Sequence, residues 1–258
     1  MSASAFRSRL LAGTPVFVTT LDFPDPSAAE FLSELGVDAV AVDTEHTAVT
    51  GPQIVELARA CKAGGGALVV KTNADPDSIG KYLDAGVAAL QIAHVKSRQD
   101  VDDVVTACQF APDGHRGLGR CRNSRFGHYA GGYAQLIKDS HDSVALIVHI
   151  ESMEAVAVLD DILAAESIDA IFVGAFDLSA SLGIPGEVLD ERVQDVIRDI
   201  VTRSRAAGKA VGMSASTPEQ TTTAIERGAT LLLSAQSRLM SNAVSQLRSA
   251  PALTGASS

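Results

Sequence analysis

The chain has 258 residues, of which 46% are hydrophobic and only 4% aromatic, and its formal net charge is −10. This length suits one large α/β domain, and the acidic balance disfavours nucleic acid or an anionic membrane as a partner. No apolar run approaches the length of a membrane span, and the three cysteines form no CxxC pair, so we expect a cytoplasmic protein with reduced thiols.

Short β-rich runs alternate with amphipathic segments along the chain. The β-rich runs are VFVTT (16–20), DAVAVD (38–43), ALVVK (67–71), AALQIA (88–93), VALIVHI (144–150), DAIFVG (169–174), AVGM (210–213) and TLLLSA (230–235). The segments expected to be helical are 26–35, 51–63, 76–85, 97–108, 153–165, 177–181, 190–207, 217–227 and 237–248. Alternating strands and helices imply a parallel sheet, and eight such units close a (β/α)₈ TIM barrel. We therefore expect a single barrel domain over residues 14–248, with a frayed tail over 249–258.

Active sites of such barrels lie at the carboxyl ends of the strands. The polar or small residues at these ends are Asp43, Thr44, Glu45, His46, Lys71, Asn73, His94, His149, Glu151, Gly174, Asp177, Ser179, Ser214, Ser234 and Gln236. The ionisable ones follow the second to sixth strands, which predicts a site on one side of the barrel mouth.

Two carboxylates, Glu151 and Asp177, follow consecutive strands. Neighbouring strands lie about 4.8 Å apart, so both side chains can reach one cation. Two carboxylates with water and substrate oxygens suit Mg²⁺ or Mn²⁺. The alternative is that each residue only caps the helix that follows it. Their occurrence as a pair at the same end of the barrel favours the metal.

His46 and Asp43 follow the second strand and suit a proton-transferring base and the carboxylate that orients its ring. The alternative is a loop histidine bonded only to backbone. Glu45 is expected to order a water beside the metal. His149 faces the same side as Glu151, since the two are two residues apart in a strand. We rank substrate hydrogen bonding first for His149, metal ligation second, and filling of the barrel interior third.

The remaining histidines carry no comparable signal: His94, His115, His128 and His141.

Several segments together resemble the HpcH/HpaI aldolase family, which comprises metal-dependent class II pyruvate aldolases. They are AVDTEH (41–46), DP…YLDAG (75–86), FAPDGHRGLG (110–119), HIESMEAV (149–156), VGAFDLSASLG (173–183) and PG (185–186). The resemblance covers residues 10–248 and implies a barrel aldolase that uses a divalent cation: Mg²⁺ or Mn²⁺, or alternatively Co²⁺ or Zn²⁺.

The resemblance also implies roles for single residues. Glu151 and Asp177 match the family's metal ligands, and His46 with Asp43 matches the pair that moves a proton through water, with Glu45 beside it. Backbone N–H groups from Gly174 to Asp177 match the cradle for the substrate carboxylate, so Phe176 lies among the substrate-binding residues. Ser214 follows the seventh strand, and we expect it to bind the substrate as well.

The resemblance further implies a homo-oligomer, namely a hexamer built as a trimer of dimers. In that assembly the last helix is exchanged between subunits, and Asp84 lies near a neighbouring subunit's site.

The chain departs from the family at the site. Lys71 stands where arginine is typical, His149 where glutamine is typical, and Ala175 where proline is typical, while Phe176 is bulkier than usual. Lysine supplies charge at position 71 but no planar fork. These changes bear on the substrate and on the reaction.

The expected reaction is cleavage or formation of the carbon–carbon bond of a 4-hydroxy-2-oxo acid, with pyruvate and an aldehyde as the partners. Lys71 and His149 would stabilise the enolate oxygen. One alternative is a lyase in which Lys71 forms a Schiff base, or an otherwise diverged 2-oxo acid lyase or decarboxylase. The Glu151–Asp177 pair disfavours the Schiff base, because carboxylates raise a lysine's pKa. A second alternative is a barrel without catalytic activity that binds a metal or an oxo acid.

Overall fold

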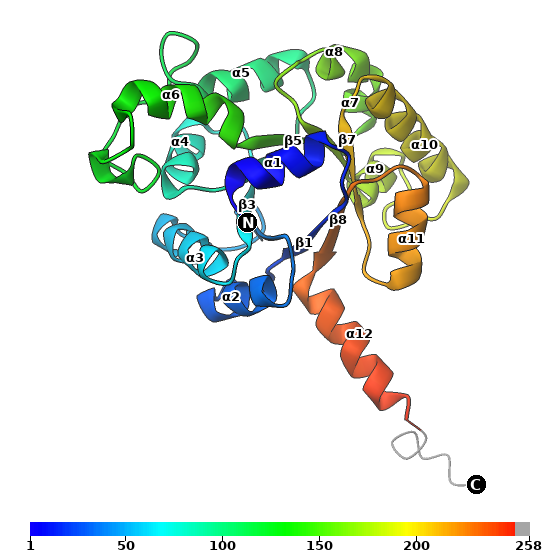
Figure 1. Cartoon of the computed structure of the whole chain (residues 1–258). Helices are drawn as coiled ribbons and strands as arrows, with labels where there is room; N and C mark the ends of the chain where they lie inside the picture. Colours follow the sequence, from blue (N-terminus) through cyan, green and yellow to red (C-terminus); the bar gives the residue numbers. More distant parts are fainter. Residues whose placement is uncertain (251–258) are drawn as a thin grey trace, which may run out of the picture.

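A computed structural model describes residues 1–250, apart from the side chains of residues 141 and 142. The side chain of His141 and residues 251–258 of the expected tail therefore lie outside the described part of the chain. Eight strands form a closed, all-parallel barrel in the order β1 to β8, and Figure 1 shows the helices arranged around it. The strands are β1 (Val16–Thr20), β2 (Ala39–Asp43), β3 (Ala67–Thr72), β4 (Ala89–Ile92), β5 (Ala145–Ile150), β6 (Ala170–Val173), β7 (Ala210–Ser214) and β8 (Leu231–Ala235). The expected eight-stranded α/β barrel is confirmed.

The helices that follow the strands match the expected segments closely. They are α2 (Pro26–Glu34), α3 (Gly51–Ala63), α4 (Pro76–Ala85), α5 (Arg98–Cys108), α9 (Ala175–Ser181), α10 (Glu191–Ala206), α11 (Pro218–Glu226) and α12 (Gln236–Arg248). Several begin at a residue whose side chain accepts a backbone N–H of the first turn, as Asp25, Asp75 and Thr217 do. Gly86, in a left-handed conformation, ends α4.

The inside of the barrel is filled mainly by small and branched side chains. This inner cluster includes Val16, Val18, Ala39, Ala41, Ala67, Val69, Ala89, Ala145, Ile147, Ala170, Phe172 and Leu231. Because side chains alternate along a strand, the next inward positions after Ala41, Val69 and Ile147 are Asp43, Lys71 and His149. The alternation that builds the core therefore also places polar groups at the mouth.

Three features differ from the sequence-based expectation. A helix, α1 (Ala3–Leu11), precedes β1; its Phe6 and Leu10 are buried against the inner cluster, and it lies across the barrel in Figure 1. Another, α6 (Gly132–Ser143), follows the long loop. The segment expected as one helix over 153–165 is two, α7 (Met153–Ala157) and α8 (Leu159–Leu163), separated at Val158.

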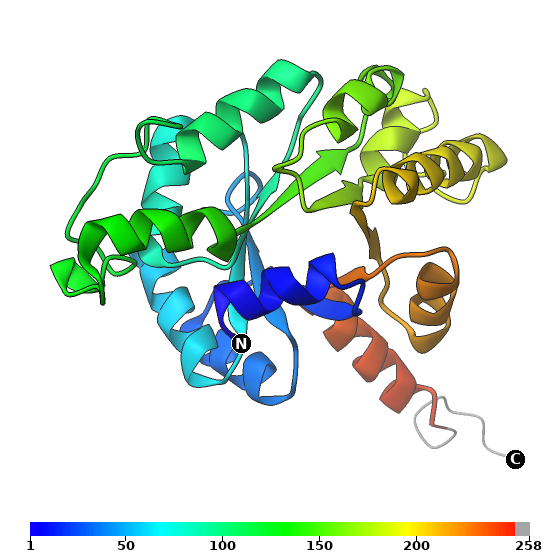
Figure 2. The same ribbon diagram turned by 45° about the horizontal axis from the view of Figure 1, so that its top comes forward.

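The last helix, α12, has no buried residue and projects from the barrel in both Figure 1 and Figure 2. Its apolar Met240, Val244 and Leu247 are exposed. A helix with an uncovered apolar side suits the expected exchange between subunits, which stays a prediction. Among the described residues, no helix combines the length and the apolar character needed to cross a bilayer.

Candidate active site

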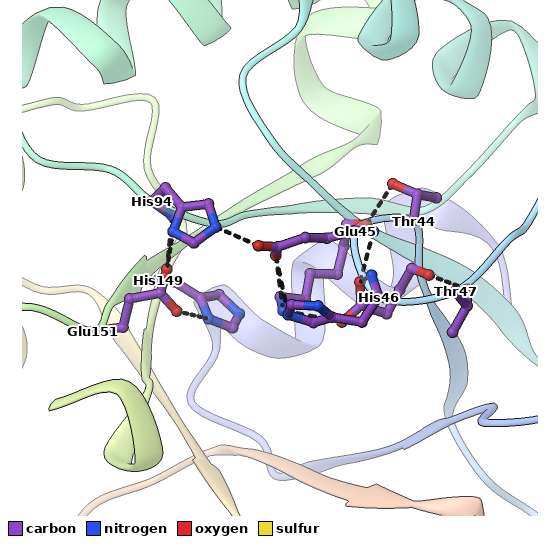
Figure 3. A network of polar contacts seen from close by, with 9 residues as sticks. Thr44, Glu45, His46, Thr47, His94, His149 and Glu151 are labelled. Carbon is purple, nitrogen blue, oxygen red and sulfur yellow. Dashed lines mark hydrogen bonds and ion pairs between the residues drawn. The ribbon is translucent and has the colours of Figure 1, made fainter. Parts of the chain in front are cut away.

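Polar side chains that follow β2, β3, β4 and β5 contact one another at the mouth of the barrel. Figure 3 shows those from the ends of β2, β4 and β5. One group lies around Lys71 of β3, and another around Glu151, which follows β5. His94, two residues beyond β4, connects the two groups. This is the end of the barrel at which the sequence predicts the site.

Lys71 is held between two carboxylates. Its Nζ donates to Asp43 Oδ2 at 3.0 Å and lies 3.3 Å from Glu45 Oε2. Burial opposes the charge of the ammonium, but these hydrogen bonds and charges outweigh burial and raise the pKa of Lys71. Burial also acts against both carboxylates, yet their hydrogen bonds and the charge of Lys71 lower the pKa of Asp43 and of Glu45. The three groups are therefore ionised together at neutral pH.

In the structure, the hydrogen bonds of Asp43 go to backbone N–H groups and to Lys71 rather than to the His46 ring, so its expected role in orienting that ring stays a prediction. Asp43 Oδ1 accepts the backbone N–H groups of Glu45 at 2.8 Å and of His46 at 3.0 Å, so it closes a tight turn after β2. The His46 side chain is 69% exposed, and its Nε2 lies 3.6 Å from Glu45 Oε2. Glu45, rather than Asp43, is the carboxylate near the imidazole.

Glu151 is a buried carboxylate with several donors around it. Its Oε1 accepts the backbone N–H of His94 at 2.7 Å and lies 3.2 Å from His94 Nδ1, while its Oε2 lies 3.2 Å from His149 Nδ1. Burial would raise its pKa, but the hydrogen bonds and charges of His149 and His94 lower the pKa of Glu151 to about 2. The backbone of Gly174 approaches so closely that a Cβ there would lie 2.5 Å from Glu151 Cβ. Only glycine fits beside this carboxylate without a shift.

The ring of His149 is held by a stacking contact and by a hydrogen bond. Its ring stacks on Phe172 with centroids 4.8 Å apart, and its Nδ1 faces Glu151. Gly212 makes room for this arrangement, since a Cβ there would lie 2.5 Å from the Phe172 ring. Within the described part of the chain, His149 Nε2 is buried and has no hydrogen-bond partner. The ring as placed therefore serves Glu151 and does not present a donor to the open mouth.

His94 is a site residue to which the sequence assigned no role. Its Nε2 contacts Glu45 Oε1 while its Nδ1 and backbone N–H face Glu151. Its φ of 59° lies in the left-handed region, which residues other than glycine rarely adopt. The available signal was its position just after the fourth strand.

The other predicted residues are less closely engaged. Asp177 and Phe176 are exposed in the first turn of α9, which follows β6, and Ser214 is exposed at the end of β7. Asp84 is not brought to this site; it lies in the last turn of α4 and pairs with Arg116 at 2.8 Å.

The two carboxylates expected to hold a divalent cation, Glu151 and Asp177, follow adjacent strands. Ile150 pairs with Val173 on the adjacent strand, so Glu151 and the first turn of α9 both follow the paired ends of these strands. Glu151 is ionised and keeps carboxylate lone pairs beyond those its neighbours use. Across residues 1–250, no group of three or more His, Cys, Asp or Glu is arranged to hold a metal ion. Joint ligation by Glu151 and Asp177 therefore remains a proposal.

The chain is similar to known proteins over most of its length. The family model for HpcH/HpaI aldolase/citrate lyase matches residues 21–237. A 4-hydroxy-2-oxovalerate aldolase of Rhodococcus jostii is 33% identical over 216 residues, covering 81% of each chain. A 2-keto-3-deoxy-L-rhamnonate aldolase of Escherichia coli is 32% identical over 248 residues, covering 95% of this chain and 91% of that protein.

Solved structures give the same result. A crystal structure of an HpcH/HpaI aldolase/citrate lyase family protein from Burkholderia cenocepacia has a TM-score of 0.87 at 28% identity, covering 95% of this chain and all of that one. The citrate synthase SbnG has a TM-score of 0.83 at 27% identity, covering 95% and 97%.

The fold and the site define an α/β-barrel enzyme whose ionisable groups gather at the carboxyl ends of the strands. The chain belongs to the HpcH/HpaI aldolase/citrate lyase family. It is a carbon–carbon lyase of the aldolase type, and this family of metal-dependent aldolases implies a divalent cation.

Proposed function

We propose that this lyase acts on a 4-hydroxy-2-oxo acid and that Glu151 and Asp177 hold the cation. The observation that carries the proposal is the buried Glu151 carboxylate, held ionised at the mouth beside the Lys71 cluster. The names of similar proteins support the substrate class, because 4-hydroxy-2-oxovalerate and 2-keto-3-deoxy-L-rhamnonate are both 2-oxo acids. A divalent cation held there would polarise the 2-oxo group as a Lewis acid. All-oxygen ligation by carboxylates favours Mg²⁺ or Mn²⁺, with Co²⁺ or Zn²⁺ as alternatives.

Lys71 stabilises the negative charge that develops on the substrate during the reaction. Its ammonium lies at the mouth, remains protonated at neutral pH, and is aimed by Asp43 and Glu45. A fixed cation in a half-buried position stabilises an enolate oxygen without having to reorganise during the reaction. Lys71 thus takes the position of the family's arginine, with a point charge in place of a planar fork.

His46 is the residue that transfers the proton. Its ring is exposed at the rim with Glu45 beside Nε2, so it can exchange protons with water and with the oxygen of the leaving aldehyde. The ionised carboxylate of Glu45 lies beside this ring. His149 acts on Glu151 instead of on the substrate, which revises the first-ranked role from the sequence.

Exchange of the methyl protons of pyruvate in deuterated water tests this function. The protein with Mg²⁺, Mn²⁺ or Co²⁺ should exchange them faster than the metal alone, EDTA should abolish the enzymatic exchange, and excess metal should restore it. NMR follows the loss of the methyl signal. Equal exchange in the EDTA-treated and metal-loaded protein would contradict the proposal.

The Schiff-base alternative predicts a different outcome that is simple to check. Because the pKa of Lys71 is raised, its amine is protonated at neutral pH and is a poor nucleophile. We expect no covalent adduct when pyruvate and borohydride are added, as measured by intact mass. A stoichiometric adduct that disappears in Lys71→Met would replace the metal route with an imine route.

We also propose a homo-oligomer in the cytoplasm. The uncovered α12 supports exchange between subunits, and the hexamer expected from the resemblance would bring Asp84 near a neighbour's site. Cys61, Cys108 and Cys121 are free thiols, which suits a reducing compartment.

A further inference from the structure

His94 joins two carboxylates that follow different strands of the barrel. Its Nε2 contacts Oε1 of Glu45 after β2, and its Nδ1 lies 3.2 Å from Oε1 of Glu151 after β5 (Figure 3). In each carboxylate the other oxygen serves a different group. Glu45 Oε2 faces Lys71 and His46, and Glu151 Oε2 faces His149. These are the charged or titratable groups around the His94 ring, and each carboxylate is held from two directions.

The backbone at His94 is bent to serve the same contact. The φ of 59° turns its N–H toward Glu151 Oε1 at 2.7 Å, while the preceding Ala93 N–H still bonds Thr72 O on β3. A left-handed residue other than glycine persists only where the surroundings hold it, and such strain gathers at functional sites. Packing does not explain it, because the His94 side chain is 57% exposed and so contributes little to the core.

We propose that His94 is a positioning residue for the cation-binding carboxylate and for the lysine cluster. It fixes Oε1 of Glu151 with both its backbone N–H and its ring, and it fixes Oε1 of Glu45, which leaves Glu45 Oε2 aimed at Lys71. Groups that hold a metal ligand in place commonly set its affinity for the metal. The inference rests on the proposed function, since it takes Glu151 to be a ligand.

Two substitutions distinguish the contribution of the His94 ring from that of its backbone N–H. His94→Gly keeps the N–H to Glu151, removes both ring contacts and relieves the left-handed strain. His94→Asn tolerates the same φ and carries an amide donor near the place of Nδ1, so it retains the contact with Glu151 but does not reach Glu45. The matched control is His115→Gln, because His115 is an exposed histidine in the 109–131 loop.

The experiment measures the Mn²⁺ dissociation constant by calorimetry and the melting temperature of the metal-free protein, in full-length wild type and in each variant. We expect His94→Gly to weaken Mn²⁺ binding about tenfold, and His94→Asn about threefold or less. The melting temperature should stay level or rise in both, because strain is relieved and no core contact is lost. His115→Gln should match wild type in both measurements.

The outcomes separate this inference from the proposed function. Mn²⁺ binding that is lost in Glu151→Gln but unchanged in His94→Gly would overturn the role of His94 alone. Weakened binding that appears only together with a fall in melting temperature, and equally in His94→Asn, would assign His94 to stability and also overturn it. Wild-type protein that binds no Mn²⁺ would remove both proposals.

Discussion

Replacing Glu151 with glutamine should abolish divalent-metal binding and lower carbon–carbon bond cleavage by about 10³-fold or more. The change keeps the size of the side chain and an oxygen that can accept the His94 N–H, but it removes the charge that would hold the cation. Loss of Lewis-acid stabilisation costs several kcal/mol in the transition state, and each 1.36 kcal/mol is about tenfold in rate. Calorimetry with Mn²⁺ and a coupled assay for released pyruvate measure the two effects.

A neighbouring glutamate provides the control for this substitution. Glu154 lies three residues further on, is exposed, and pairs with Lys96 at 3.2 Å on the surface of α7. Glu154→Gln removes the same charge from nearly the same place in the chain without touching the mouth, so it should retain wild-type binding and turnover. Turnover in Glu151→Gln within about tenfold of wild type would be too small an effect for a metal ligand.

The same residue links stability to pH in the metal-free protein. The pKa of Glu151 is lowered to about 2 from an ordinary 4.5, so its ionised form stabilises the fold above about pH 5. That contribution is on the order of 3 kcal/mol or less, and it disappears as the pH falls from about 5 toward 2. Urea unfolding of Glu151→Gln should therefore show a weaker loss of stability over this pH window than wild type does.

The barrel follows from the sequence because its strands obey a simple pattern. Each buried strand is bounded by turn residues and followed by an amphipathic helix, and the observed elements differ from the expected ones by one or two residues at most of their ends. The helix α1 lacks a clear helical pattern in the sequence, because only Phe6 and Leu10 of its nine residues are buried. The helix α6 begins at Gly132, directly after Gly131; both glycines have a positive φ, and they lie in a stretch whose glycines indicate a loop.

The site could be located from sequence, but its contacts could not. Alternation along β2, β3 and β5 places Asp43, Lys71 and His149 inward at one end of the barrel. The partner of each side chain depends on loop conformation, which periodicity does not encode. Asp43 bonds backbone N–H groups because the chain turns sharply after β2, and His94 reaches Glu151 only because of its left-handed φ.

His149 illustrates the same limit for a core residue. Its position two residues before Glu151 could be predicted from the sequence. Its stacking on Phe172 could not, because this contact depends on the register of three strands and on the space that Gly212 leaves on the third. His149, which stands where the family typically has glutamine, thus lies in one inner layer of the barrel with Phe172 and Gly212. Substitutions at His149, Phe172 and Gly212 are therefore expected to be coupled.

Replacing Lys71 with methionine should reduce turnover by about 10²- to 10³-fold, the usual cost of removing one preorganised electrostatic group. Methionine keeps an unbranched chain of similar length, so the loss reports the charge. Asp43 and Glu45 would then face each other without the ammonium that lies 3.0 and 3.3 Å from them. Breaking a buried ion pair costs 3–5 kcal/mol, and we expect about 2 kcal/mol here because the Lys71 side chain retains 19% exposure.

Two further variants decide whether this loss is catalytic. Lys62→Met removes an exposed lysine in the last turn of α3 and should leave turnover and stability unchanged. Lys71→Arg restores the charge and the family's usual side chain, so it should recover most of the stability and a large part of the turnover. Turnover in Lys71→Met equal to wild type would show that the enolate oxygen is stabilised elsewhere. Recovery of stability without turnover in Lys71→Arg would mean that the compact ammonium, rather than charge alone, fits this substrate.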